Sequence, residues 1–182
     1  MSLQRHAANP LKLIFSLYID PNFEFNSNML DKIDKKIITA LQRDGRLSNV
    51  ALADQVGLSP SACLRRVQIL EDSGVVSGYT ALVNANALGR STNVIVAITL
   101  DRQNGEFLDA FEDAVAACPD VMECYLMAGE SDYVLRVIVK DAADYERIHK
   151  DHLSRLPGVA RIQSSFSLRQ VVARNGIDVN IP

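Results

Sequence analysis

One short stretch of the sequence combines small polar residues, a proline and two adjacent arginines, which suit contacts with a nucleic acid. Ser59 and Pro60 are typical of a helix start, with Ser as N-cap and Pro at the first helical position. The N–H groups of such a start can bind a phosphate, and an arginine one turn later can reach guanine O6 and N7 or another phosphate. The residues expected to face outward are Ser61, Ala62, Arg65, Arg66 and Gln68.

Other residues with potential chemistry form no recognisable catalytic or metal-binding pattern. His149 and His152 lie three residues apart without a third ligand in view, so we interpret them as part of a solvated helix face. Cys63 falls on an inward helical stripe and is interpreted as a core thiol. The sequence carries none of the familiar phosphate-loop, metalloprotease or hydrolase motifs. We therefore expect no enzymatic activity, no catalytic residues, no metal site and no cofactor.

Composition places the chain among ordinary globular proteins. Its 182 residues include 19 Lys or Arg and 22 Asp or Glu, 48% are hydrophobic, and the formal net charge is -3. These fractions exclude collagen-like, coiled-coil and largely disordered chains. No apolar run approaches the roughly 20 residues that span a bilayer, so no membrane partner is expected. Three scattered cysteines favour reduced thiols in a cytoplasmic protein over a disulfide framework.

Three helical stripes precede residue 75, and they place the polar stretch described above. Each consists of apolar residues at helical spacing: Ile33, Ile37, Ile38 and Leu41; then Leu52, Ala53 and Val56; then Cys63, Leu64, Val67 and Leu70. Ser48 is a good N-cap for the second helix, and Gly57 suits a left-handed turn between the second and third. This arrangement predicts a helix-turn-helix, which either reads DNA with its last helix or serves as a plain packing scaffold.

The second half predicts a small sheet with helices. Val- and Ile-rich segments at 93–100, 121–127, 133–140 and 159–172 are interpreted as strands. Helical spacing lies between the first and second strands and again between the third and fourth. The resulting β-α-β-β-α-β order is that of a ferredoxin-like fold, with both helices on one face of an antiparallel sheet. A partner sheet from a second subunit is the simplest cover for the other face.

The two halves differ in charge. Residues 29–78 carry seven Lys or Arg against six Asp or Glu, whereas residues 79–182 carry ten against fourteen. The first half is therefore the only place where a polyanion would be tolerated. The overall acidity argues against a non-specific nucleic-acid coat but is compatible with a specific binder that has a local basic face.

Many of these residues resemble the Lrp/AsnC family of prokaryotic transcription regulators, from Leu30 to about Val172. The similar segments are LDKID at 30–34, DGRLSN at 44–49, LA at 52–53, VGLSPSACLRRV at 56–67 and LEDSGVVSGYTA at 70–81. In the second half they are ECY at 123–125, MAGESDY at 127–133, LPGV at 156–159 and SSF at 164–166. The resemblance implies that 49–68 is the helix-turn-helix, which adds Asn49 and the Ser59–Pro60 start to the expected DNA-binding residues.

The resemblance also implies an amino-acid pocket between subunits. Its expected residues are Met127, Gly129, Ser131, Asp132, Tyr133, Ser164 and Ser165. The chemistry fits an amino acid. Asp132 could accept hydrogen bonds from the ligand's ammonium group, and the Gly129 amide and the serine hydroxyls could donate hydrogen bonds to the ligand's carboxylate. The plainer interpretation is a hairpin turn in which Gly129 supplies positive φ and Asp132 caps the loop.

These observations divide the chain as follows. Residues 1–28 form an expected flexible extension, with Met29 as a candidate natural start; 29–78 form a winged helix-turn-helix; and 79–91 contain a linking strand around 79–84. Residues 92–172 form the ferredoxin-like effector and oligomerisation domain, and 173–182 form a C-terminal tail. The fold class is therefore α+β.

The expected function is transcriptional regulation through sequence-specific binding to double-stranded DNA, modulated by a small-molecule effector such as leucine or another amino acid. A homodimer would read half-sites about one helical turn apart, and the resemblance implies higher oligomers such as octamers. We expect a bacterial or archaeal, cytoplasmic, nucleoid-associated protein. The alternatives are a ligand-independent architectural DNA binder and an enzyme or enzyme-regulatory subunit; the latter leaves the helix-turn-helix residues without a purpose.

Overall fold

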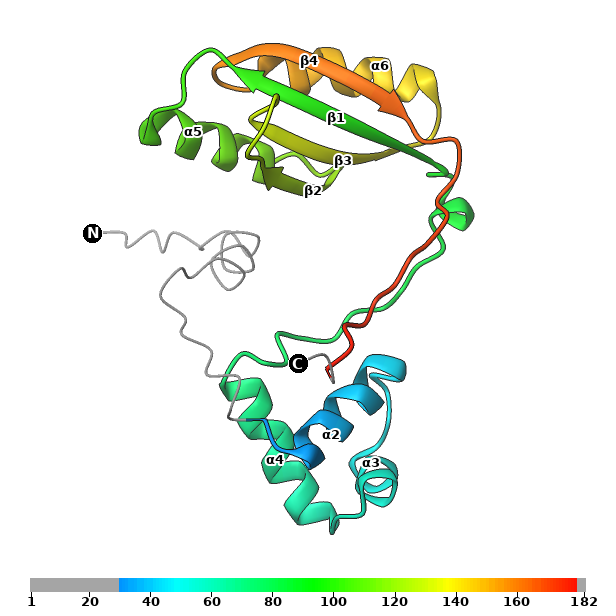
Figure 1. Ribbon diagram of the computed structural model, residues 1–182. Coiled ribbons are helices and arrows are strands. Elements are labelled where there is room, and N and C mark those ends of the chain that lie inside the picture. Colours follow the sequence, from blue (N-terminus) through cyan, green and yellow to red (C-terminus); the bar gives the residue numbers. More distant parts are fainter. Residues whose placement is uncertain (1–29, 180–182) are drawn as a thin grey trace, which may run out of the picture. The chain divides into compact units, whose positions relative to one another are not determined.

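A computed structural model describes residues 30–179, and these form two compact units (Figure 1). The first unit contains residues 30–82 together with 172–179, and the second contains residues 83–171. The predictions for the extension at 1–28 and for a start at Met29 lie outside the described residues. Among the described helices, none has the length and apolar character needed to cross a bilayer.

The first unit consists of three helices, α2 (Lys32–Arg43), α3 (Asn49–Val56) and α4 (Pro60–Asp72). Helix α2 begins with a capping box, in which the Asp31 carboxylate accepts from the Ile33 and Asp34 amides and the Asp34 carboxylate accepts from the Asp31 amide. Ser48 and Ser59 are the N-caps of α3 and α4, and their hydroxyls accept from backbone amides three residues later.

A small apolar core holds these three helices together. Its fully or nearly buried residues are Ile37, Ile38, Leu52, Ala53, Val56, Cys63 and Leu70. Ala53 is completely buried, in agreement with the close helix packing that its small side chain permits. Val179, at the end of the described chain, also packs against this core. The C-terminal segment is therefore part of the helical unit, although the sequence predicted a separate tail.

The predicted linking strand at 79–84 is wrong. These residues are irregular and lead into the 3₁₀ helix η2 (Ala85–Leu88), which begins with the Asn84 side chain accepting from the Asn86 amide and ends at Gly89 with φ 69°. A strand needs a neighbouring strand for its hydrogen bonds, and the described chain offers none at this position. Leu82 and Val83 in this segment are largely exposed.

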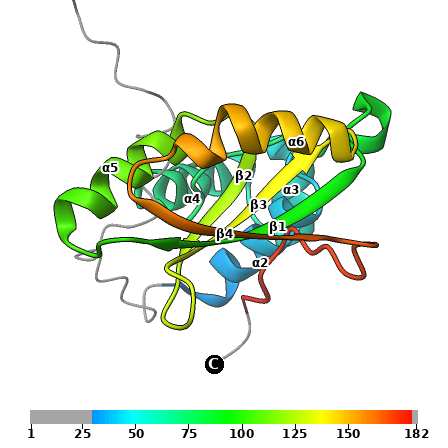
Figure 2. The ribbon, with the colours of Figure 1, turned by 90° about the horizontal axis from the view of Figure 1, so that it is seen from above.

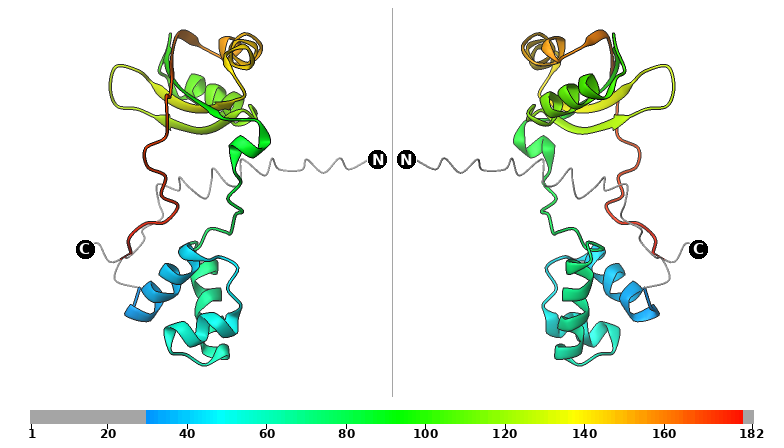
Figure 3. Two further views of the ribbon diagram at one scale, coloured as in Figure 1. Left: turned by 90° about the vertical axis from the view of Figure 1, so that its right-hand side faces the viewer. Right: turned by 90° about the vertical axis from the view of Figure 1, so that its left-hand side faces the viewer.

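The second unit has the predicted β-α-β-β-α-β order. Its elements are β1 (Thr92–Leu100), α5 (Gly105–Ala116), β2 (Val121–Leu126), β3 (Tyr133–Val139), α6 (Ala142–Asp151), the 3₁₀ helix η3 (Leu153–Arg155) and β4 (Val159–Phe166). All strand pairs are antiparallel, in the order β2-β3-β1-β4. Both α5 and α6 lie on one face of the sheet (Figures 2 and 3). The α+β, ferredoxin-like prediction is therefore confirmed.

The last strand ends six residues earlier than predicted. Phe166 pairs with Val94 of β1, and the Ser167 amide still donates to the Asn93 carbonyl. Strand β1 itself begins at Thr92, which lies opposite position 168 in this register, so residues beyond 168 have no further length of β1 to pair with. The exposed Leu168, Val171 and Val172 continue the apolar pattern without forming a strand.

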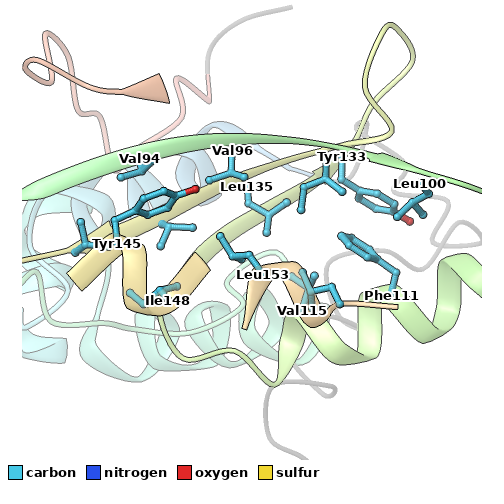
Figure 4. Packing of buried hydrophobic residues seen from close by; sticks show 14 residues of the cluster. Val94, Val96, Leu100, Phe111, Val115, Tyr133, Leu135, Tyr145, Ile148 and Leu153 are labelled. Carbon is cyan, nitrogen blue, oxygen red and sulfur yellow. The ribbon is translucent and has the colours of Figure 1, made fainter. Parts of the chain in front are cut away.

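Strict alternation in the central strands builds the core of this unit. Odd-numbered residues of β3, from Tyr133 to Val139, are buried, while the even-numbered residues between them are partly exposed. Figure 4 shows the buried side chains of β1 and β3 facing those of α5, α6 and η3. Phe111 and Tyr133 pack with ring centroids 4.5 Å apart. This packing fixes the direction of every strand residue, and hence which candidate site residues can reach a ligand.

Candidate functional site: a helix-turn-helix and a loop at the sheet end

The turn between α3 and α4 is tightly fixed. Gly57 has φ 75°, a left-handed conformation that favours glycine, and the Leu58 amide donates to the Ala53 carbonyl at 2.9 Å. Leu58 packs against the helical core, as expected for a residue filling the angle between the helices. The Asn49 side-chain amide donates to the Pro60 carbonyl at 2.7 Å. Asn49 thereby ties the start of α3 to the start of α4.

Helix α4 presents an exposed polar face. Ser61, Arg65 and Gln68 are exposed, and they lie at the helical spacing i, i+4 and i+7 that places residues on one side. Ser59 and Pro60 are exposed at the helix start, and Ala62 is half-buried beside them. Arg65 makes no ion pair with any other residue between 30 and 179. Its guanidinium is therefore free to bind an external acceptor.

Arg66 has a different environment from its neighbour. Its Nη1 donates to the Asp34 carboxylate at 2.7 Å and to the Asp31 carboxylate at 2.8 Å, and its side chain is 27% exposed. The hydrogen bond to Asp34, followed by that to Asp31, raises the pKa of Arg66 above its ordinary value. Arg66 therefore joins α4 to the first turn of α2, and this geometry does not support the prediction that it contacts DNA directly.

The prediction that Leu64 faces the core is wrong. Its side chain is 47% exposed, whereas Cys63 and Leu70 are buried and Val67 packs partly against the core. The three inward residues already fill the arc of α4 that meets α2 and α3. Because successive helix residues turn by 100°, Leu64 lies at the margin of that arc, where it meets solvent.

A basic groove on the first unit was missed by the sequence reasoning. It has a volume of ≈ 790 Å³ and lies between α2 and α3. Four of its lining residues are cations: Lys32, Lys35, Lys36 and Arg43. The i, i+3, i+4 spacing of the three lysines on α2 was visible in the sequence, but the near balance of charges over residues 29–78 concealed it. The groove supplies the local positive field that a DNA-binding unit needs in an acidic chain.

In the second unit, the candidate effector loop joins β2 to β3 and projects beyond the sheet (Figures 2 and 3). Met127 and Gly129 are exposed in it, and Ser131 is half-buried. The Asp132 carboxylate accepts from the Leu100 amide at 2.7 Å and from the Gln103 side-chain amide at 2.6 Å. Asp132 therefore anchors the loop to the end of β1, and both its oxygens already have a partner.

The other candidate effector residues point in different directions. Tyr133 is buried under α5 and donates its hydroxyl to Glu112 at 2.7 Å, and burial is the main cause that raises its pKa. Ser164 faces α6 and hydrogen-bonds the Tyr145 hydroxyl. Ser165 lies opposite Ile95 of β1, on the face without helices, because successive strand residues alternate. One chain thus brings Met127, Gly129, Ser131 and Asp132 together but does not gather all seven residues around one cavity.

The second unit also has an ionic cluster that the sequence did not reveal. Asp120 is 4% exposed, and its carboxylate lies 2.5 Å from Arg90 Nη1 and 4.0 Å from Arg147 Nη2. Arg90 follows η2 and also donates to the Ile138 carbonyl at 3.3 Å. A cleft of ≈ 450 Å³ beside it is lined by Leu88, Gly89, Arg90, Lys140, Asp141, Ala143 and Asp144. The cluster therefore ties Arg90, in the segment between η2 and β1, to Asp120 and to Ile138 of β3.

These two units define a helix-turn-helix DNA-binding protein with a second, ligand-binding unit. The sequence model of a winged helix-turn-helix DNA-binding domain matches residues 30–77, and that of the Lrp/AsnC ligand binding domain matches residues 93–177. No strand of a wing is formed in the described part of the first unit. The chain belongs to the Lrp/AsnC family of transcriptional regulators.

Similar proteins agree with this assignment. The chain is 44% identical to the Bkd operon transcriptional regulator of Pseudomonas aeruginosa over 80% of this chain and 95% of that protein. It is 42% identical to the leucine-responsive regulatory protein of Escherichia coli over 80% of this chain and 89% of that protein. A transcriptional regulator from Neisseria meningitidis, solved in complex with L-methionine, superposes with a TM-score of 0.78 at 35% identity, covering 83% of this chain and 97% of that chain.

Proposed function

We propose that the N-terminal half of α4 enters the major groove of operator DNA and reads its bases. The observation that carries this proposal is the exposed face formed by Ser61, Arg65 and Gln68 on a helix held in place by the Gly57 turn. In helix-turn-helix proteins, the first residues of the second helix contact base edges. Arg65 would donate to guanine O6 and N7, while Ser61 and Gln68 have hydroxyl and amide groups for other base edges or phosphates.

The remaining predicted DNA-binding residues take supporting roles in this proposal. Ser59, Pro60 and Ala62 form the start of α4, whose free amides can bind a phosphate while small side chains allow close approach. Asn49 and Arg66 act indirectly, because their side chains already link α3 to α4 and α4 to α2. The cations of the α2–α3 groove add attraction for the DNA backbone.

We further propose that the second unit binds an amino acid at the β2–β3 loop. The match to a ligand-binding domain supports this, as does the L-methionine complex of the Neisseria relative. The exposed loop of Met127, Gly129 and Ser131 offers a backbone amide and a hydroxyl for a carboxylate, and Asp132 offers a carboxylate for an ammonium group. Because Ser164 and Ser165 lie apart from the loop within one chain, a second subunit would have to complete the pocket.

A second copy of the chain would cover the face of the sheet that carries no helices. That face holds Ile95, Val134 and Ile138 along the central strands, and Ile95 is 39% exposed. The proposed assembly is a homodimer, with higher oligomers such as an octamer built from it. An effector bound at the subunit interface would favour one assembly geometry, which changes the spacing of the paired α4 helices and hence operator affinity. Such a protein would act in the cytoplasm, on the nucleoid.

Two measurements test the proposal separately. Selection of binding sites from a random duplex library should return an operator with two half-sites about one helical turn, or a multiple of it, apart. A thermal-shift panel against the twenty amino acids should show a selective rise, since a ligand at 100 times its Kd adds about 2.7 kcal/mol. A flat panel together with sequence-indifferent binding and a steep salt dependence would instead identify an architectural DNA-binding protein.

A further inference from the structure

We propose that Leu64 is a specificity-determining residue that contacts the 5-methyl group of a thymine in each operator half-site. The proposal rests on the DNA-reading role of α4 given above, and it adds an apolar contact to the polar ones. It assigns a base preference to a residue that helical periodicity had placed in the core.

The exposure of Leu64 is the first observation behind this proposal. Its side chain is 47% exposed on a helix whose inward side is filled by Cys63, Val67 and Leu70. Leu64 is not among the residues that pack against the core of the unit. A single exposed leucine is ordinary on a protein surface, so a role in DNA binding also requires that Leu64 lie on the DNA-facing side of the helix.

Leu64 belongs to the face of α4 that the proposed function directs at DNA. Counting from Ser61, it lies at i+3, between Ser61 and Gln68 along the helix and next to Arg65. Residues at i, i+3, i+4 and i+7 share one side of a helix. Leu64 is also the fifth residue of α4, within the N-terminal half that contacts bases in helix-turn-helix proteins. At 100° per residue, Leu64 lies about 60° from Ser61 and 40° from Gln68 around the helix, at the edge of the face that these two residues form.

The chemistry of an aliphatic side chain narrows what it can recognise there. Leucine has no donor or acceptor, so it gains nothing from phosphates or from the polar edges of guanine, cytosine and adenine. The thymine methyl is the apolar group that a base pair presents in the major groove. Burying one methyl group is worth about 0.8 kcal/mol, which corresponds to a roughly fourfold change in affinity.

A second exposed apolar residue on the same helix provides a matched control. Ile69 is 53% exposed and, at i+4 from Arg65, also borders the polar face, but it lies five residues after Leu64, about 7.5 Å farther toward the C-terminal end of the helix. It is followed closely by Glu71 and Asp72, whose carboxylates repel phosphates. Leu64 has only Arg65 and Arg66 as charged neighbours in the sequence, so the DNA-facing end of α4 is the end that carries Leu64.

The test replaces thymines of the selected operator one at a time with deoxyuracil, which removes only the methyl group. For the unaltered protein, we expect one position in each half-site at which this replacement weakens binding roughly fourfold. The Leu64→Ala protein should bind the thymine and uracil operators equally at that position. The Ile69→Ala protein should keep the sensitivity of the unaltered protein.

Several outcomes would overturn the proposal. One is an operator in which no uracil replacement weakens binding of the unaltered protein, a measurement that needs no variant to fold. Another is a Leu64→Ala protein, with unchanged melting temperature, that is still fourfold sensitive to the same methyl group. Failure of the proposed DNA-reading role would look different, since then the Arg65→Ala protein would bind the selected operator as tightly as the unaltered one.

Discussion

The side chain of Gln42 on α2 pairs with the backbone of Ile177 through two hydrogen bonds. Gln42 Nε2 donates to the Ile177 carbonyl at 3.0 Å, and the Ile177 amide donates to Gln42 Oε1 at 2.5 Å. A Cβ atom on the adjacent Gly176 would lie 2.8 Å from Gln42 Oε1, so glycine permits this approach. The second unit comprises residues 83–171. The helical unit is therefore built from the chain segments on both sides of it, residues 30–82 and 172–179.

We expect Gln42→Ala to destabilise the helical unit by about 1 kcal/mol, the typical net contribution of an intramolecular hydrogen bond. The cause would be release of the C-terminal segment, together with the apolar contact of Val179. Urea unfolding followed by a probe on the helical unit would measure the change. Gln55→Ala on α3 is the matched control, and equal effects of the two substitutions would show that the Ile177 contact contributes nothing.

The two adjacent arginines of α4 should behave differently. Arg65→Ala should cost about 1–3 kcal/mol of operator binding, because it removes a base or phosphate contact, and should leave the melting temperature unchanged. Arg66→Ala should lower the melting temperature, because Asp31 and Asp34 lose their partner on α4, and should weaken binding to all sequences alike. Gel-shift titrations and calorimetry on both proteins check this, and the reverse pattern would contradict our assignment of roles.

Much of this organisation followed from periodicity and turn chemistry. The Ser48 and Ser59 caps and the left-handed Gly57 are local features, so the sequence determined them without tertiary information. The burial of every second residue of β3 was not predicted, and the buried Tyr133 was instead assigned to the effector pocket. Leu64 was misplaced because a helical stripe read from sequence does not show how wide an arc its neighbours cover.

Features that depend on distant residues could not be predicted. Arg66 was assigned to DNA because its partners Asp31 and Asp34 lie more than thirty residues away. Asp120 was not singled out in the sequence, because its partners Arg90 and Arg147 lie far from it along the chain. Ser164 and Ser165 were grouped together, although adjacent strand residues must point to opposite faces. For Arg66 and Asp120 the missing information was the pairing of distant segments, whereas the opposite directions of Ser164 and Ser165 follow from strand alternation alone.

Removing Arg90 should destabilise the second unit by about 1–3 kcal/mol, because it leaves the carboxylate of buried Asp120 without its nearest partner. Arg147→Ala should cost less, since Arg147 lies 4.0 Å from Asp120 and also pairs with Asp144. The double variant Arg90→Ala, Asp120→Ala should be less destabilised than the sum of its single changes. Additive effects in thermal or urea unfolding would contradict a direct coupling.

Acidic pH should lower the stability of the second unit, because it protonates the Glu123 carboxylate. The hydrogen bond from Arg136, at 2.6 Å, is the main cause that holds the pKa of this carboxyl below its ordinary value. A lowered pKa in the folded state means that the interaction stabilises the protein above the unfolded value of about 4.3 and is lost as pH falls through the folded pKa. Carboxyl NMR titration should show the low midpoint, and Glu123→Gln should flatten the decline in melting temperature below pH 4.3. A Glu123 midpoint at or above about 4.3 would contradict the assignment.

Asp132 should control the effector response through its charge and through the loop that it anchors. A charge-assisted hydrogen bond is worth about 1.5–3 kcal/mol, so Asp132→Ala should weaken effector binding roughly ten- to hundredfold while operator binding without effector is kept. Gln103→Ala separates the two contributions, because it removes one of the two anchors of the carboxylate and leaves its charge in place. If Asp132 acts only by positioning the loop, the Gln103→Ala protein should respond to the effector more weakly than the unaltered protein. If Asp132 instead contacts the ligand's ammonium group directly, the Gln103→Ala protein should respond as the unaltered protein does. Thermal shift with the effector found in the amino-acid panel measures both variants, and an unchanged response of Asp132→Ala would place the pocket elsewhere.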